Sequence, residues 1–249
     1  MKKLVLIFAV FMLISSISSG QITVSGSVGA NGTYSSLTNA AGAFLAINGT
    51  AQTGATIVIT ITANVTTETG TNGLNAGAWS SLTIKPSGAR TISGSVAAPL
   101  ILLNGADYVT IDGLNTSGNS LVISNLSTSA TSATSTVRFI ADATNNTITN
   151  CSILGSSTMA VATNGGNIFI STGTTTGNDN ITISNCKIGP AGVNLPSKGI
   201  YANGSTTSAA IANSNITITN CEIFDFFLAL NCAGVYAGSG NTDWSITNN

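Results

Sequence analysis

A nine-residue phrase returns along this chain at a nearly constant interval. NITISNCKI at 180–188 is followed by NITITNCEI at 215–223, and a shorter copy, NTITNCSI, lies at 146–153. Within each copy β-branched apolar residues alternate with Thr or Ser, which predicts a short strand. Repeats of roughly 25–35 residues that hold strands and show no helical periodicity predict a β-solenoid, in which each coil stacks on the one before.

The copies align on one isoleucine each, and equivalent residues should stack in columns. The landmarks are Ile84, Ile111, Ile148, Ile183, Ile218 and Ile246. Two residues later comes an expected structural ladder of amides at a turn: Asn150, Asn185, Asn220 and Asn248, with Gly113 and Pro86 in the same position upstream. Asn and Gly tolerate the left-handed backbone of a sharp turn, and stacked amides can bond one another. Just past the turn, Cys151, Cys186 and Cys221 should stack, with Ile153, Ile188 and Ile223 beside them in the core.

The two ends of the chain differ from the repeats. Residues 36–51 predict an amphipathic helix that starts at Thr38 or Asn39 and ends at Asn48-Gly49. Its apolar face would carry Leu37, Ala41, Phe44, Leu45 and Ile47. Such a helix would cover the open end of the coil stack, and residues 56–66 would supply the first strand. The chain ends in SITNN, inside a repeat copy, so we expect it to be the front of a longer protein.

The first twenty residues have the pattern of a secretory signal peptide. Two lysines precede the apolar run 4–14, and Ser18 and Gly20 are the small residues before a cleavage point at Gln21. The expected organisation is a signal peptide at 1–20, an N-terminal cap and first strand at 21–66, and β-helix coils at 67–249. No later run has the roughly twenty apolar residues of a membrane helix, so no membrane span is expected.

Several phrases together carry a family resemblance. LTIKPSGARTISGS, LLNGADYVTIDGLN and the repeated ITNC are similar to secreted bacterial right-handed parallel β-helix proteins of the pectin-lyase-like class, and more narrowly to surface or adhesin-like proteins of Bacteroidota. The resemblance covers most of residues 22–249. It implies an all-β, right-handed parallel β-helix and a secreted or cell-surface location, but one fold carries many functions.

The charge and the cysteines exclude several classes of site. After Lys2 and Lys3, five basic and eight acidic residues remain, with no basic cluster, so no nucleic-acid partner is expected. The chain has no His and no C-x-x-C, so we expect neither a metal nor another cofactor. Stacked thiols suit disulfide geometry poorly, which favours buried free Cys, and a Cys221–Cys232 bridge stays open as the alternative.

The acidic residues do not form an evident catalytic pair. Without His, Ser-His-Asp and Cys-His arrangements are excluded. Glu222 and Asp225 are close in sequence but should face opposite sides of a strand, and Asp107, Asp179 and Asp243 precede repeat strands as turn-bonding residues would. We therefore expect no catalytic residue in this segment. Lys187 and Glu222 follow Cys in neighbouring repeats and could pair across coils.

Aligned strands bring large side chains to one outward column. ILLNG, VRFIA, IFIST, IYANG and VYAGS place Leu102, Arg138, Phe169, Tyr201 and Tyr236 in that column. Outward aromatic rings can stack on sugars or on a partner protein, so Arg138, Phe169, Tyr201 and Tyr236 form a candidate ligand-binding stripe. The alternative is that a long loop folds over the stripe, or that the rings only stabilise the sheet.

These features together predict a secreted or surface-displayed structural or adhesive module without catalysis in this segment. Its partners would be extracellular glycans or surface proteins. The alternative is a polysaccharide-binding or polysaccharide-degrading protein, lyase-like or glycosidase-like, with reactive coils beyond residue 249.

Overall fold

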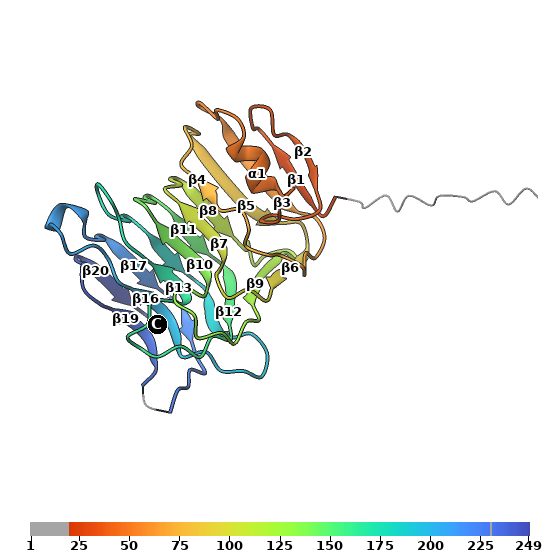
Figure 1. The fold of residues 1–249 in the computed structure, drawn as a ribbon. Coiled ribbons are helices and arrows are strands. Elements are labelled where there is room, and N and C mark those ends of the chain that lie inside the picture. The colour runs from red at the N-terminus through yellow and green to blue at the C-terminus, as the bar shows by residue number, and fades with distance from the viewer. Residues whose placement is uncertain (1–19, 230) are drawn as a thin grey trace, which may run out of the picture.

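The chain folds into a parallel β-helix of about six turns. The structure, a computed structural model, describes residues 20–229 and 231–249. Successive coils lie one beside the next from the N-terminal end to the C-terminal end (Figure 1). The predicted fold class, all-β with parallel stacked coils and a short N-terminal helix, is confirmed. The predicted signal peptide lies outside the described residues, apart from Gly20.

The coils contribute strands to three sheets, and the order in each sheet follows the chain except that β2 lies outside β1 at the edge of the largest sheet. The nine-stranded sheet contains, in order, β2 (Gly32–Tyr34), β1 (Ile22–Ser25), β3 (Thr56–Ile61), β5 (Ser81–Pro86), β8 (Val109–Asp112), β11 (Thr147–Thr149), β14 (Thr182–Ser184), β17 (Ile216–Thr219) and β20 (Trp244–Thr247).

The other two sheets close the coil. The six-stranded sheet contains β19 (Ala233–Ala237), β16 (Lys198–Ala202), β13 (Gly166–Ile170), β10 (Ser135–Ile140), β7 (Pro99–Asn104) and β4 (Leu74–Asn75). The five-stranded sheet contains β18 (Glu222–Ile223), β15 (Lys187–Pro190), β12 (Cys151–Gly155), β9 (Ser120–Asn125) and β6 (Ala89–Gly94). A 3₁₀ turn, η1 (Ala209–Ile211), interrupts the loop before β17.

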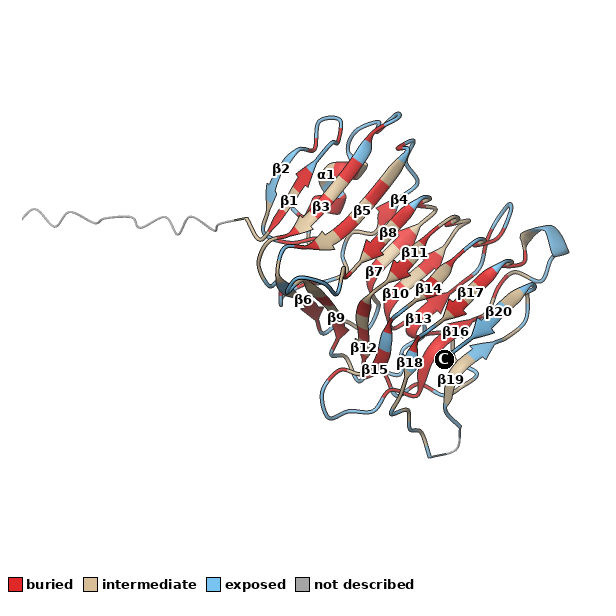
Figure 2. Cartoon of the chain, turned by 180° about the vertical axis from the view of Figure 1, so that it is seen from behind, coloured by how far each residue is buried: buried red, intermediate tan, exposed pale blue. Residues whose placement is uncertain are grey.

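The isoleucine landmarks form the predicted column. Each pairs in register with the next across parallel strands, in the order Ile59, Ile84, Ile111, Ile148, Ile183, Ile218 and Ile246. A second column in the five-stranded sheet runs through Ile92, Ile123, Ile153, Ile188 and Ile223. Burial alternates along the central strands of the nine-stranded sheet, such as β5 and β8, whereas β13 and β16 are buried at every position (Figure 2). Like apolar residues therefore fill the interior in layers.

The turn after the nine-stranded sheet is built by left-handed Asn backbones. Asn150, Asn185, Asn220 and Asn248 have φ of 56°, 52°, 53° and 56°. The backbone N–H of Asn150 donates to Ser184 O at 3.2 Å, and that of Asn185 donates to Thr219 O at 3.1 Å, so the turns are bonded from coil to coil.

Gly113 occupies the same turn position, but the expected left-handed backbone is wrong there. Its φ is not positive, and the left-handed residues follow it at Leu114 and Asn115. Glycine is needed for close approach instead, because a Cβ at residue 113 would lie 2.0 Å from the carbonyl oxygen of Asn150.

The N-terminal helix is shorter than predicted. α1 spans Ala43–Asn48, with Gly42 as its N-cap and no side-chain cap, so the predicted start at Thr38 or Asn39 is wrong. Those two side chains have other partners: Thr38 Oγ1 donates to Glu68, and Asn39 Oδ1 accepts from the Thr69 N–H at 2.8 Å. Tertiary bonds outcompeted local capping.

The helix end at Asn48-Gly49 is confirmed, and this end attaches α1 to the stack. Asn48 Nδ2 donates to Gly73 O at 2.8 Å, just before β4, and Asn48 Oδ1 accepts from the N–H of Asn75, the last residue of β4, at 3.0 Å. Glu68 is buried nearby and accepts hydrogen bonds from the N–H groups of Leu37 and Thr38.

An antiparallel hairpin completes the N-terminal end. β1 pairs with β2 on one side and with β3 on the other, both antiparallel. Neither β1 nor β2 was predicted from the sequence. The first strand was expected at 56–66, whereas β3 spans Thr56–Ile61. A reversal of direction gives the edge of the parallel sheet a partner that cannot continue the coil.

The thiols of Cys151, Cys186 and Cys221 lie one above another at the start of the five-stranded sheet and are buried. Each Sγ donates to a backbone oxygen, that of Cys151 to Thr149 O at 3.1 Å. Burial raises the pKa of Cys151 to about 12, and contact with the Cys221 thiol, followed by burial, raises the pKa of Cys186. All four cysteines are free and Cys232 is exposed, so the alternative Cys221–Cys232 bridge is not formed.

We predict that Ile183→Ala destabilises the whole stack. The side chain is fully buried between Ile148 and Ile218, and its truncation leaves a cavity in a rigid column, with an expected loss of about 3 kcal/mol. Urea unfolding measures the change. Thr182→Ala, on the outer face of the same strand, is the control and should cost less than about 1 kcal/mol; equal losses for the two variants would contradict the layered core.

Candidate functional site

The candidate stripe forms a continuous column on the six-stranded sheet. Leu102 pairs with Arg138, Arg138 with Phe169, Phe169 with Tyr201, and Tyr201 with Tyr236. The rings of Phe169 and Tyr201 are tilted, with centroids 5.6 Å apart, and those of Tyr201 and Tyr236 are stacked at 5.3 Å and 8°. The strand register therefore brings the predicted residues together.

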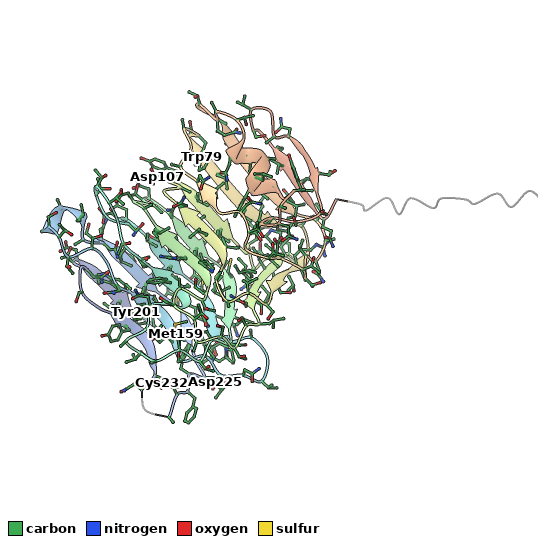
Figure 3. All side chains as sticks on the ribbon, in the orientation of Figure 1. Trp79, Asp107, Met159, Tyr201, Asp225 and Cys232 are labelled. Carbon is green, nitrogen blue, oxygen red and sulfur yellow. The ribbon has the colours of Figure 1, made fainter. Side chains whose placement is uncertain are left out.

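Most of this stripe is covered. Phe169 is 1% and Tyr201 3% exposed, yet neither belongs to the interior core cluster, so their rings lie outside the sheet under other residues. Over Tyr201 the cover is the segment 156–165 between β12 and β13, which contains the fully buried Met159 and whose Asn164 accepts a hydrogen bond from the Tyr201 hydroxyl at 3.2 Å (Figure 3). Among the aromatic residues of the stripe, only Tyr236 presents an exposed ring, at 39%. The structure thus shows the covering loop that the sequence left open as an alternative.

Lys198 holds the covering segment in place. Its side chain is fully buried, and Nζ donates to the carbonyl oxygens of Ala160 at 3.1 Å, Val161 at 3.3 Å and Thr163. Nζ also lies 4.1 Å from the centroid of the Tyr201 ring. Burial lowers the pKa of Lys198 to about 8, while the three carbonyl oxygens favour its charged form.

Arg138 is half-buried at the other end of the stripe. Its guanidinium lies 4.9 Å from the Phe169 ring centroid, and Nη2 donates to Ser171 Oγ at 2.9 Å. Nε is buried without a hydrogen-bond partner, and desolvation lowers the pKa of Arg138. Among the described residues neither Arg138 nor Lys198 forms a salt bridge.

The acidic side chains near the strands bond the backbone of the next coil. Asp107 Oδ1 accepts from the Thr144 N–H at 2.6 Å, and Asp179 Oδ1 accepts from the Ser214 N–H at 2.6 Å. The turn-bonding interpretation of these two residues is confirmed. Each carboxylate closes one coil onto its neighbour.

Asp142 has the largest set of bonds of any acid in the described chain. Its carboxylate accepts from the backbone N–H groups of residues 174–177 at 2.8–3.1 Å and from the Thr174 hydroxyl. Partial burial raises the pKa of Asp142, but the bonds from Thr174, Thr175 and Thr176 outweigh it and hold the pKa well below its usual range. The loop 171–179 is therefore folded around an anion supplied by the chain itself.

The ion pair between Lys187 and Glu222 is exposed to solvent. Lys187 Nζ lies 3.0 Å from Glu222 Oε2 across the five-stranded sheet, with 65% and 60% of the two side chains exposed. The predicted cross-coil pair is confirmed, and its contribution to stability is small. Within the described ranges no group of His, Cys, Asp and Glu could hold a metal ion, and no helix is long and apolar enough to cross a membrane.

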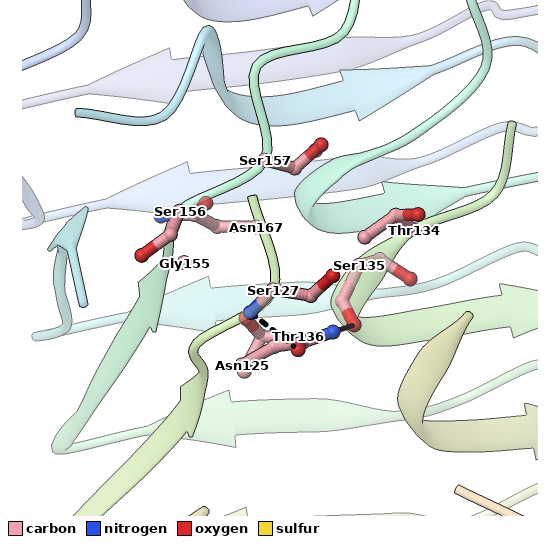
Figure 4. A pocket seen from close by; sticks show the side chains of 10 residues that line it. Asn125, Ser127, Thr134, Ser135, Thr136, Gly155, Ser156, Ser157 and Asn167 are labelled. Carbon is pink, nitrogen blue, oxygen red and sulfur yellow. Dashed lines mark hydrogen bonds between the residues drawn. The ribbon is translucent and has the colours of Figure 1, made fainter. Parts of the chain in front are cut away.

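A polar hollow lies at the corner between the five- and six-stranded sheets (Figure 4). Asn125 Nδ2 donates to Ser135 O at 2.9 Å, Thr136 Oγ1 to Leu154 O at 2.6 Å, and Asn167 Nδ2 to Gly189 O at 2.7 Å. These side chains leave no room for a water molecule. The polar side chains therefore fill this corner and connect the five- and six-stranded sheets by hydrogen bonds.

Two features were not predicted from the sequence: the role of Lys198 beside the aromatic column, and the position of the bonded Asn side chains. Lys198 appeared only as one of several scattered basic residues, although a Lys three residues before Tyr201 on the same strand is a usable signal for a cation–π contact. The amide chain was expected at Asn150, where the side chain instead donates to Asp112 at 2.9 Å. Amides bond directly at the other end of the strands, from Asn180 to Asn145 at 3.1 Å and from Asn215 to Asn180 at 2.6 Å.

Comparison with known proteins found no match: no family model, no curated protein and no solved structure is similar to this chain.

We predict that Asp142→Asn lowers stability in a pH-dependent way. The low folded pKa means that the carboxylate stabilises the fold above its unfolded pKa of about 3.9, and that this contribution is lost as the pH falls toward the folded pKa. Because the side chain is partly exposed, we expect a loss of about 1 kcal/mol at pH 7 that shrinks below pH 4. Denaturant unfolding from pH 7 to pH 3 measures it.

Asp225→Asn is the matched control, since Asp225 also has a left-handed backbone, at φ 55°, and Asn tolerates it. A constant difference between Asp142→Asn and the wild type across this pH range would show that the carboxylate charge does not hold the loop.

Proposed function

We propose that this protein is an exported β-helix scaffold that displays an attachment surface, and that its described coils carry out no catalysis. The observation that carries the proposal is the use of the acidic side chains. Those of Glu68, Asp107, Asp142 and Asp179 accept backbone N–H bonds that close the cap, a coil or a loop. Carboxylates engaged in this way support the stack.

The acid–base alternative has little support in these coils. A glycosidase needs two free carboxyl groups within about 5–10 Å of each other across a substrate cleft. Glu222 is paired with Lys187 on an open sheet face, and its sequence neighbour Asp225 lies in a left-handed turn beyond β18. A polysaccharide-degrading role would therefore need groups other than these acids.

Export is supported by the backbone contacts of Gln21, the residue after the inferred cleavage point. The N–H of Gln21 donates to Tyr34 O at 2.8 Å, and its carbonyl accepts from the N–H groups of Thr62 and Ala63 at 2.9 and 3.1 Å. A chain cut before Gln21 keeps all three bonds. Cleavage at the point inferred from the sequence would thus leave Gln21, the residue directly before β1, with these bonds intact.

An attachment role is supported by the exposed end of the aromatic column. Tyr236 stacks on Tyr201, which is fixed by Lys198 and by a hydrogen bond to Asn164 at 3.2 Å. A rigid exposed ring can stack on a sugar with little loss of conformational entropy. Extracellular glycans are therefore the partner class that we propose, with a surface protein as the alternative.

We predict that Tyr236→Ala reduces glycan or cell-surface binding at least about tenfold, because it removes the exposed ring of the column. A glycan array followed by titration of each hit measures this. Phe227→Ala is the control, since Phe227 is a more exposed aromatic residue outside the column. Equal binding by the wild type and Tyr236→Ala would remove the aromatic site from the proposal.

We predict that the exported protein begins at Gln21. Expression of the full chain in a secreting bacterial host, followed by intact-mass measurement of the extracytoplasmic fraction, identifies the N-terminus. A Gly20→Leu variant should accumulate uncleaved, because the residue before the cleavage point must be small. Retention of the intact chain in the cytoplasm of the wild-type strain would sink the export proposal.

A further inference from the structure

The outer face of the nine-stranded sheet carries a regular array of hydroxyl side chains. On each strand the two residues that flank the landmark isoleucine are only partly buried or exposed, and that isoleucine is buried on every strand except β20, where Ile246 is exposed. From β8 to β20 these outward residues are Thr110 and Asp112, Thr147 and Thr149, Thr182 and Ser184, Thr217 and Thr219, and Ser245 and Thr247. All except Asp112 are Thr or Ser.

The array is periodic in two directions. Each outward residue pairs in register with its equivalent on the next strand, as Thr147 does with Thr182, and Thr149 with Ser184. The same register continues from β8 to β20 without an offset. Parallel strands lie about 4.8 Å apart, and alternate residues of one strand about 6.6 Å apart. The hydroxyl groups therefore occupy a two-dimensional lattice with these two spacings.

The lattice is rigid and its hydroxyls are available. Thr is β-branched, so its side chain has few rotamers to lose. In one column, hydroxyl groups bond across the coils: Ser184 Oγ donates to Thr149 Oγ1 at 2.9 Å, and Thr247 Oγ1 donates to Thr219 Oγ1 at 3.1 Å. In the other column, Thr147, Thr182 and Thr217 make no side-chain hydrogen bond to any described residue, and their side chains are partly open to solvent. Water must satisfy these hydroxyls.

Charge is nearly absent from this surface. Left-handed Asn residues border both ends of the central strands, among them Asn145 and Asn180 on one side and Asn150 and Asn185 on the other. Lys85 and Asp112 lie toward the N-terminal edge of the face, and Asp243 lies beside the last strand. An ordered, uncharged surface of hydroxyl and methyl groups imposes its own spacing on the first layer of water without binding an ion.

We propose that this face, the threonine lattice, binds ice. Water oxygens in hexagonal ice repeat along two perpendicular directions. One interval is close to the spacing between strands, and the other is somewhat longer than the spacing of alternate residues along a strand. Water held between the hydroxyl groups can therefore belong to the crystal, because each strand spans only one interval of the second kind. Each contact is weak, but the side chains are already ordered before binding and little entropy is lost. The methyl groups of Thr keep the intervening water from hydrating the face as it would a flexible polar surface.

A crystalline polysaccharide is the competing periodic ligand, and the structure favours ice. Binding to sugar rings relies on exposed aromatic side chains, and the threonine lattice contains none. The aromatic column lies on a different sheet, the six-stranded one, so this proposal does not depend on the glycan-binding role of Tyr236. The two surfaces can be disabled separately.

The test is adsorption of the purified full chain to growing ice. Partition between ice and liquid during slow freezing, and inhibition of ice recrystallisation, are measured for the wild type, Thr182→Tyr and Ser152→Tyr. Thr182 is central in the lattice, and a bulky ring there lifts the face from a flat surface, so partition into ice should fall at least about tenfold. Ser152→Tyr adds the same ring to the five-stranded sheet and should leave partition unchanged.

Folding and the competing ligand are checked with the same variants. Circular dichroism and urea unfolding must show the wild-type transition for Thr182→Tyr; if they do not, Thr182→Val, which keeps the shape and removes the hydroxyl, replaces it and should also weaken partition. Wild-type partition equal to that of an unrelated protein, or equal partition for Thr182→Tyr and Ser152→Tyr, would overturn the proposal. Lattice-dependent binding to microcrystalline cellulose without adsorption to ice would overturn it in favour of a polysaccharide. Tyr236→Ala should leave adsorption to ice unchanged, which separates failure of this proposal from failure of the glycan site.

Discussion

In-register parallel hydrogen bonding between successive coils is the constraint on which the rest of this structure depends. Once Ile148 pairs with Ile183 and Ile183 with Ile218, every neighbouring position is also matched with its counterpart. A shift by one residue would turn each isoleucine to the surface and each threonine to the core. The layered core, the thiol stack, the aromatic column and the threonine lattice are all consequences of this single register.

The fold is stabilised with little contribution from charge. Asn, Asp, Ser and Thr side chains replace water at backbone groups that the turns leave without partners. An interior amide chain illustrates the point: Asn178 Nδ2 donates to Asn213 Oδ1 at 3.0 Å, and Asn213 Nδ2 donates to Asn241 Oδ1 at 3.1 Å. The exposed ion pair of Lys187 and Glu222 adds little to this. The unusual composition, with 6% charged residues, is thus a requirement of coil stacking.

The aromatic column and the loop that covers it differ in how far the sequence predicts them. The aromatic column was predictable, because period-two alternation and the repeat interval together assign each residue to a face and to a neighbour. Its cover was not predictable, because the contacts of Lys198 with Ala160 and Val161 join segments far apart in sequence and follow no local pattern. The prediction of where α1 starts was wrong for the same reason, because the side chains of Thr38 and Asn39 form hydrogen bonds with Glu68 and Thr69 instead of capping the helix.

The sequence by itself determined the repeat, and through it the strands, the coil-to-coil register and the columns of Ile, Cys, Asn and Thr. These depend on alternation and spacing, which are local properties of the chain. Only the tertiary structure decided which columns remain open to solvent. Tyr201 and Thr182 both point outward from their sheets, yet a loop buries the first while the second stays partly exposed. That difference depends on the path of a long loop, and the free energy of such a path is set by contacts that form only after the coils have stacked.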